Sequence, residues 1–295
     1  KKSFLLVLAV LIPIIFSSAV FADPIGWGLD TRLTANDADS LDPSLLVDTA
    51  GNVHVVWHDY RDSANGELYY EKMDNNGNTL IDDRRLTFNA SVKSRSPSLA
   101  HNAANELALV WHTNKAYVPF PVNEVYYRKM DANGNSLTPD IRVSFNQIPG
   151  GGTSSEYPAV AVDGNGDVHV VWEDYRFSFT EIFYRKLSSA GAYLTPEINV
   201  SDATQTSTSA SLAIDGNGNV HIVWQDQRNG GNFEIYYRKL SNAGVPLTPA
   251  IRVTTLQNPC GGSYAPSVAV DSFGNVHIAW HTTQFDAGSY CMTKV

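Results

Sequence analysis

Short runs of β-branched and aromatic residues recur along the chain after residue 22, and clusters of Gly, Asn, Asp and Pro separate them. Runs of this length and composition predict β-strands joined by tight turns. Beyond residue 22, apolar residues do not follow the 3.6-residue spacing of an amphipathic helix. The pattern therefore predicts an all-β protein.

One phrase occurs five times, and each copy ends at a tryptophan. The copies are PSLLVDTAGNVHVVW, PSLAHNAANELALVW, PAVAVDGNGDVHVVW, ASLAIDGNGNVHIVW and PSVAVDSFGNVHIAW, which end at Trp57, Trp111, Trp172, Trp224 and Trp280. A second phrase of the type EIYYRK follows each copy, at 67–73, 124–130, 181–187, 234–240 and, in degraded form, 289–295. A third phrase of the type IRVS follows at 84–87, 141–144, 197–200 and 251–254.

Each unit therefore supplies four strands, because the first phrase holds two strands around an Asp-x-x-Gly-Asn hairpin turn. In the second unit Asn105 stands where the others have Gly, and Asn tolerates a positive φ best after Gly. Four antiparallel strands in a repeat of roughly 50 residues predict a β-propeller. The units cover about 31–87, 88–144, 145–200, 201–254 and 255–295, which gives five blades. A fragment of a larger ring is the alternative.

The fifth unit lacks the third phrase, and residues 31–34, Thr-Arg-Leu-Thr, match that phrase. We expect this segment to pair with residues 289–295, which would remove an exposed sheet edge. The predicted fold is thus a five-bladed β-propeller of four-stranded antiparallel blades, with the last blade completed by the N-terminal strand.

Residues 1–22 have the pattern of a secretory signal peptide. Lys1 and Lys2 precede an apolar run at 4–16, and small residues lead to a cleavage site after Ala22. The run is short for a membrane span, which needs roughly 20 apolar residues; an uncleaved anchor is the alternative. We expect residues 23–295 to form a single secreted or periplasmic domain with no membrane span.

Charge and cysteine content narrow the possible partners. The formal net charge of −9 argues against nucleic-acid binding, which favours a basic surface. We expect no cofactor, no metal site and a monomer. Cys260 and Cys291 are the two cysteines, and we expect them to form a disulfide in an oxidising compartment.

The phrase VAVDxxGNVHVVW resembles the repeat of secreted bacterial sialidase-like (BNR-type) propeller proteins, and also the matching phrase of NHL-type propellers. The resemblance covers nearly all of the chain beyond residue 22 and implies the blade structure. The Asp-box of true sialidases, Ser-x-Asp-x-Gly-x-x-Trp, does not occur in the sequence. The resemblance therefore implies the fold more strongly than the activity.

The repeat helps to distinguish structural residues from site residues. We expect a residue found in nearly every blade to serve the packing of the blade itself. We expect the five tryptophans to pack between blades. A histidine recurs at one position, and we expect hydrogen-bonded structural roles, with a ligand role as the alternative, for His54, His169, His221 and His277. Asp163-Gly-Asn-Gly-Asp167 resembles a calcium loop in composition, but we expect a plain hairpin turn.

The motif Trp-x-Asp-x-Arg occurs in three units, and its residues are Asp59/Arg61, Asp174/Arg176 and Asp226/Arg228. Each arginine precedes a glutamate of the second phrase, Glu67, Glu181 or Glu234. One interpretation is a repeated Asp–Arg–Glu ion-pair set that fixes the hairpin. The other is an arginine cluster for a carboxylated ligand, since arginine binds carboxylates through a bidentate fork.

The loops after the second and the fourth strand of each unit lie on one side of the disc, which we call the loop face. These loops vary in length and composition, and function usually lies on such loops. Aromatic residues among polar ones suit a sugar, although these aromatics could instead pack within their own loops. The candidate ligand-binding residues are Asp59, Arg61, His112, Tyr117, Phe120, Asp174, Tyr175, Arg176, Phe177, Asp226 and Arg228.

These features favour a secreted binding module for a glycan or for an extracellular or envelope protein, rather than an enzyme. The alternative is a sialidase-like glycoside hydrolase, which needs two carboxylates roughly 5–10 Å apart, one with a raised pKa. The non-repeated acids of the loop face are Glu156, Glu173, Asp62 and Asp286. A purely structural envelope protein is a third possibility.

Overall fold

The computed structural model describes residues 32–89, 91–114, 122–145, 153–255, 261–285 and 291–294. Every regular element within these ranges is a β-strand, which confirms the all-β prediction. Across the same ranges, no helix is long and apolar enough to cross a membrane.

The strands form five antiparallel sheets, one for each repeat unit. The first sheet contains β1 (Ser40–Val47), β2 (Val53–Asp59), β3 (Glu67–Met73) and β4 (Thr79–Arg85). The second contains β5 (Ser94–His101), β6 (Leu107–Thr113), β7 (Glu124–Met130) and β8 (Ile141–Arg142). The third contains β9 (Ser155–Val162), β10 (Val168–Asp174), β11 (Glu181–Leu187) and β12 (Ile198–Asn199). The fourth contains β13 (Ser207–Ile214), β14 (Val220–Asp226), β15 (Glu234–Leu240) and β16 (Ile251–Arg252), and the fifth contains β17 (Ser263–Val270), β18 (Val276–Phe285) and β19 (Cys291–Lys294).

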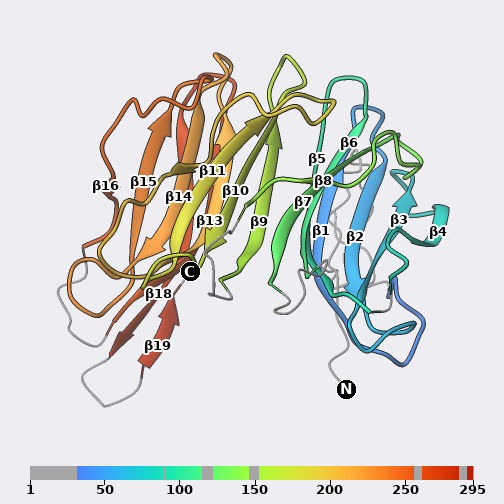
Figure 1. Ribbon diagram of the computed structural model, residues 1–295, viewed down its shortest axis with the longest axis horizontal. Coiled ribbons are helices and arrows are strands. Elements are labelled where there is room, and N and C mark those ends of the chain that lie inside the picture. The colour runs from blue at the N-terminus through green and yellow to red at the C-terminus, as the bar shows by residue number, and fades with distance from the viewer. Residues whose placement is uncertain are drawn as a thin grey trace, which may run out of the picture.

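The sheets stand face to face in chain order, as Figure 1 shows, with β1–β4 and β17–β19 at opposite sides of the view. The first strand of each sheet contacts the first strand of the next, from β1 to β5, β9, β13 and β17. A sheet between two others is covered on both faces. This explains why every residue of β6, β10 and β14 is buried, although the residues alternate between the two faces. The residues of β2 are buried too, and there the N-terminal segment with Leu33 packs on the face that has no neighbouring sheet.

The repeated tryptophans pack between sheets, as predicted. Trp111, Trp172 and Trp224 are fully buried. Each lies in a cluster with the apolar residue of the preceding unit's third phrase, in the pairs Leu86 with Trp111, Val143 with Trp172 and Val200 with Trp224. The apolar residue of the third phrase therefore packs each sheet against the next one.

Leu33 takes this position on the first sheet. It packs on the cluster of Val53, Val55 and Trp57, as Leu86 packs on the cluster of Trp111. Residues 32–35 are nevertheless not in a strand, and the described part of the fifth sheet contains three strands. The expected pairing of residues 31–34 with 289–295 is thus not among the strand pairs of the described residues.

The register of the fifth sheet differs from that of its siblings. In the first sheet Trp57 lies opposite Tyr69, the third residue of the second phrase. The matching residue of the fifth unit, Cys291, lies opposite Phe285 and not opposite Trp280. The phrase SYCMTKV lacks the Glu and Arg of its siblings, and register is weakly specified where side-chain contacts do not fix it.

The hairpin turns agree with the sequence prediction. Asn105 has a φ of 58°, so it adopts the conformation for which its siblings use Gly. Asp163 accepts hydrogen bonds from the backbone N–H groups of Asn165 and Asp167 at 2.9 and 3.0 Å, which are the contacts of an ordinary hairpin turn.

Candidate functional site

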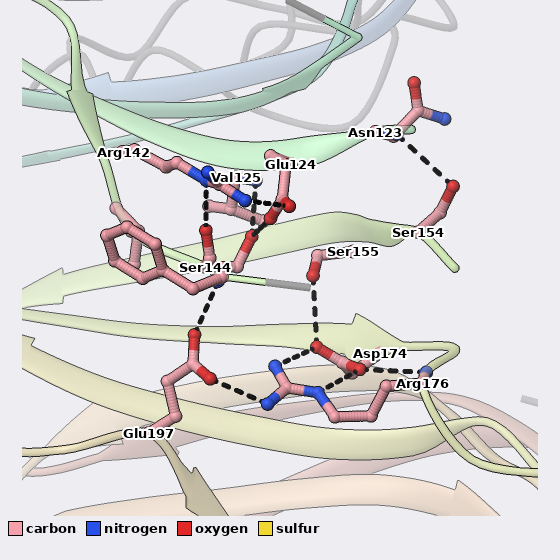
Figure 2. Close-up of polar contacts among 12 residues, drawn as sticks. Asn123, Glu124, Val125, Arg142, Ser144, Ser154, Ser155, Asp174, Arg176 and Glu197 are labelled. Atoms are coloured by element: carbon pink, nitrogen blue, oxygen red, sulfur yellow. Dashed lines mark hydrogen bonds and ion pairs between the residues drawn. The ribbon is translucent and has the colours of Figure 1, made fainter. Parts of the chain in front are cut away.

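The Asp–Arg pairs of the Trp-x-Asp-x-Arg motif are bound within the scaffold, as Figure 2 shows for Asp174 and Arg176. Asp174 is buried and accepts hydrogen bonds from Ser155 Oγ at 3.0 Å, Trp172 Nε1 at 2.9 Å, and Nε and Nη2 of Arg176 at 2.7 Å each. Arg176 also bonds Glu197 at 2.7 Å. The same buried aspartate contacts recur for Asp59 and Asp226.

The three arginines lie over aromatic rings of the neighbouring strand. The guanidinium carbons of Arg61, Arg176 and Arg228 lie 4.4, 4.3 and 4.5 Å from the ring centres of Tyr69, Phe183 and Tyr236. The glutamates of the second phrase accept hydrogen bonds from a hydroxyl that lies just after the fourth strand, as Glu124 does from Ser144 in Figure 2. The expected three-membered Asp–Arg–Glu set is therefore two separate polar clusters.

The recurring histidines have structural partners, which confirms that prediction for three of them. Nδ1 of His169 lies 2.9 Å from the Tyr184 hydroxyl, and Nε2 lies 3.1 Å from Asp163. His54 and His221 make the same two contacts. His277 keeps the aspartate contact, with Asp271 at 3.1 Å, but its side chain is 64% exposed.

The remaining sequence candidates fall into two groups. Tyr117, Phe120 and Cys260 lie outside the described residues, and Cys291 is described only as part of the backbone of β19. His112, Tyr175 and Phe177 are described: His112 is buried, the Tyr175 hydroxyl donates to Glu173 at 3.0 Å, and Phe177 is 55% exposed against Phe183.

A layer of variable residues lies one position below the loop face in every sheet. It consists of a residue near the start of the first strand and its cross-strand partner, which is the residue after the repeated tryptophan. The five pairs are Leu41–His58, Arg95–His112, Glu156–Glu173, Thr208–Gln225 and Tyr264–His281. Neighbouring positions repeat from blade to blade, so this layer is where the blades differ in chemistry.

The next residue of each first strand forms a bulge with a positive φ. These residues are Asp42, Ser96, Tyr157, Ser209 and Ala265, with φ between 45° and 55° in each case (48°, 48°, 50°, 55° and 47°). The bulge turns a backbone N–H toward the preceding sheet. Tyr157 donates to His112 Nδ1 at 3.4 Å, Ser209 to Glu173 Oε1 at 2.8 Å and Ala265 to Gln225 Oε1 at 3.0 Å. The residue after the tryptophan thus links each of these sheets to the next.

Seven residues of the first three sheets form a polar and aromatic group at this level, which we call the loop-face cluster: His58, Arg95, His112, Glu156, Tyr157, Glu173 and Tyr175. Tyr157 is 51% exposed, whereas His58, His112 and Glu173 are buried. The His112 and Tyr157 rings meet edge to face with centres 5.7 Å apart. The cluster therefore combines one exposed aromatic ring with a floor of buried titratable groups.

Burial dominates the electrostatics of this floor. It lowers the pKa of His112 to about 3, and the nearby Arg95 guanidinium acts in the same direction. Burial also lowers the pKa of His58, and this outweighs the opposite effect of Asp42, whose Oδ2 lies 3.5 Å from His58 Nδ1. The floor histidines are therefore neutral at physiological pH and leave Arg95 as the cation of this region.

Glu156 and Glu173 form the carboxylate pair that a hydrolase interpretation requires. They are direct cross-strand partners, and such partners have Cβ atoms about 4.5–5.5 Å apart. Burial raises the pKa of Glu173, and the charge of Glu156 adds to this. Both oxygens of Glu173 are engaged, with Ser209 and Tyr175, while Glu156 accepts from Asn123 at 2.6 Å.

Glu156, Glu173, His112 and Tyr175 are candidates from the sequence, although no sequence pattern brings them together. Arg95 and Tyr157 are not among those candidates. A usable signal was present. The residue after each repeated tryptophan is His, His, Glu, Gln and His in turn, between positions that hardly vary.

The fold defined by these sheets is a β-propeller, and solved structures agree. A protein of unknown function from Dyadobacter fermentans is 11% identical, with a TM-score of 0.62 over 83% of this chain and 75% of that chain. The α-L-arabinanase of Penicillium chrysogenum, complexed with arabinobiose, is 12% identical, with a TM-score of 0.59 over 86% of this chain and 80% of that chain.

A Hadza microbial sialidase is 9% identical, with a TM-score of 0.56; the match covers 85% of this chain and 57% of the sialidase. No family model matches the sequence. No curated protein matches it either. At these identities the likeness establishes the propeller fold, and the function has to be argued from the loop-face cluster.

Proposed function

We propose that this protein binds a glycan on its loop face, with Tyr157 as the platform on which a sugar ring stacks. Aromatic rings bind the apolar C–H faces of sugars, while neighbouring polar groups select among the hydroxyls. Arg95 and Glu156 of the same loop-face cluster supply a donor and an acceptor. The arabinanase neighbour, complexed with arabinobiose, supports a sugar ligand on this fold.

The conformation of Tyr157 carries the proposal. A positive φ is a genuine outlier for a bulky residue. The other four bulges use Asp, Ser, Ser and Ala, which suit this backbone better, yet the third blade places an exposed tyrosine there. Strained residues that persist tend to cluster at binding sites. A binding role for the exposed ring explains why a tyrosine occupies a backbone conformation that disfavours bulky residues.

A glycan array followed by calorimetry with its best oligosaccharide tests the proposal. Tyr157→Ala should weaken binding by roughly 1–3 kcal/mol, the scale of burying one large apolar side chain. The variant should fold, because Ala265 occupies the matching bulge of the fifth sheet. Phe273→Ala is the matched control, since Phe273 is 88% exposed in a hairpin turn on the opposite side. Equal affinities for the parent and Tyr157→Ala would reject this platform.

Glycoside hydrolysis is the second candidate, and the opposed pair of Glu156 and Glu173 favours it. A carboxyl with a raised pKa next to an ionisable one is the arrangement of a glycosidase acid and its partner. Binding remains the preferred proposal because both oxygens of Glu173 hold scaffold groups. Turnover of aryl arabinofuranosides or sialosides that disappears in Glu156→Gln while binding persists would establish the enzyme instead.

The proposal includes a location outside the cytosol, as expected from residues 1–22. Fractionation of cells that express the full chain, with mass spectrometry of its N-terminus, tests this. A mature chain that starts at residue 23 would support it, and an unprocessed cytosolic chain would argue against it.

A further inference from the structure

Glu71 of β3 breaks the repeat at a position where its siblings carry arginine. The matching residues of the next three sheets are Arg128, Arg185 and Arg238. Each of these arginines donates to a carbonyl of the preceding sheet, namely that of Leu86, Val143 or Val200. A glutamate cannot make this contact, so the first sheet holds an acid where the scaffold otherwise uses a cation.

The aspartate that pairs with this arginine in the second sheet is also present in the first sheet. In the second sheet Arg128 bonds Asp140 at 2.7 Å. The first sheet keeps the corresponding Asp83 and adds Asp82, so Glu71 faces two carboxylates. One carboxylate oxygen from each of Glu71, Asp82 and Asp83 lies within 4.8 Å of the other two. One ion at the usual calcium–oxygen distance, about 2.3–2.6 Å, reaches oxygens spaced in this way.

Two oxygens of this group are buried without a donor. Glu71 is 3% exposed, and its Oε2 has no hydrogen-bond partner in the described part of the chain, while its Oε1 accepts from Thr79 at 3.0 Å. Oδ1 of Asp83 is likewise buried and unpartnered, although Oδ2 pairs with Arg61. Buried carboxylate oxygens normally have partners, because desolvating them is costly. These two therefore indicate a missing positive partner between them.

We propose that Glu71, Asp82 and Asp83 bind a calcium ion that replaces, in the first sheet, the guanidinium group of the sibling arginines. Calcium suits the site because all donors are oxygens, the carboxylates come from two strands and exposed Asp82 leaves room for water ligands. The ion would tie β3 to the middle of β4, where the pairing register shifts. This inference is independent of glycan binding.

The test is thermal unfolding of the full chain in EDTA and in a CaCl2 titration, with calorimetry of the same titration. The parent should melt at a higher temperature in CaCl2 and bind one equivalent of calcium. Glu71→Arg supplies the sibling side chain, so it should melt in EDTA at least as high as the parent and show no response to calcium. Asp82→Asn changes an exposed residue, so it should keep the melting temperature in EDTA. Its affinity for calcium should fall at least about tenfold, since even a change in a residue that only supports a metal ligand lowers metal affinity by this much.

Asp140→Asn is the matched control, because it changes the equivalent of Asp83 in a sheet that carries the arginine. It should leave the calcium response unchanged. A parent chain that does not respond to calcium would overturn the proposal, and so would a response that survives in both Glu71→Arg and Asp82→Asn. A parent stabilised by acid but not by calcium would show that the carboxylates share a proton instead.

Discussion

The backbone N–H of Ser209 donates to Oε1 of Glu173 at 2.8 Å, and this bond joins the fourth sheet to the third. Gln225 makes the same link to Ala265 at 3.0 Å, so an amide oxygen serves as well as a carboxylate. Glu173→Gln should therefore keep the link and the fold. Glu173→Ala should cost about 1–3 kcal/mol in urea unfolding, because it removes the acceptor of both the Ser209 N–H and the Tyr175 hydroxyl. Equal stabilities of the two variants would show that the link contributes nothing.

The same residue should make stability depend on pH. Burial raises the pKa of Glu173 in the folded protein above its unfolded value of about 4.3. Folding then takes up a proton between the two pKa values, so this group stabilises the parent at low pH and the contribution is lost as pH rises through the folded pKa. Glu173→Gln should gain stability relative to the parent across that window. A constant difference between them from pH 4 to 8 would contradict this.

Asp174→Ala tests whether the Asp–Arg pairs serve the fold or a ligand. The change removes the buried acceptor of Ser155, Trp172 and Arg176. Removal of one partner of a buried ion pair typically costs 3–5 kcal/mol, and we expect a loss of about that size in urea unfolding. Glycan affinity, measured where the variant is still folded, should hold. Lost affinity at parental stability would favour the arginine cluster that binds a carboxylated ligand.

Leu33→Ala tests the packing of the N-terminal segment. Leu33 is half-buried on the cluster of Trp57, so we expect a loss of roughly 1–2 kcal/mol in chemical denaturation. Leu86→Ala, at the buried equivalent on Trp111, should cost about 2–5 kcal/mol and serves as the comparison. Deletion of residues 23–36 should cost more than Leu33→Ala. A deletion variant that melts like the parent would exclude a clasp.

The Cys260–Cys291 disulfide stays a prediction. It would close a loop of about 30 residues, worth roughly 3–4 kcal/mol in the chain-entropy model. Non-reducing peptide mapping of the exported protein should find the two cysteines in one cross-linked peptide, and reduction should lower the melting temperature. Two free thiols in the exported protein would disprove the bridge.

The repeat made the scaffold predictable. The five copies of one phrase predicted that Trp111 packs between sheets, that His169 has a hydrogen-bonded structural role and that Asn105 is a turn residue with a positive φ. The structure agrees in each case. Each of these residues solves a problem that recurs in several blades, so its role can be inferred from its recurrence.

The site was less predictable because it depends on a shift of strand register within the third sheet and on contacts between sheets. Glu156 and Glu173 are 17 residues apart, and their pairing depends on the bulge at Tyr157 that shifts the register of β9. The sequence motif directed attention to Arg176, whose hydrogen-bonding capacity is used by Asp174 and Glu197. The register of β19 in the fifth sheet differs from that of its siblings, since a degraded phrase carries too little pattern to fix it.

The exposed His277 indicates where the molecule opens first. Its equivalents His54, His169 and His221 are covered by a following sheet, whereas no described strand covers the outward face of β18. In repeat architectures stability spreads from neighbour to neighbour, and local opening starts where a unit has fewest neighbours. Amide hydrogen exchange should therefore fall into zones, with rapid exchange in β17–β19 and the slowest exchange in β10, whose sheet is covered on both sides. Local unfolding would begin in the fifth blade while the amides of the third blade remain protected from exchange.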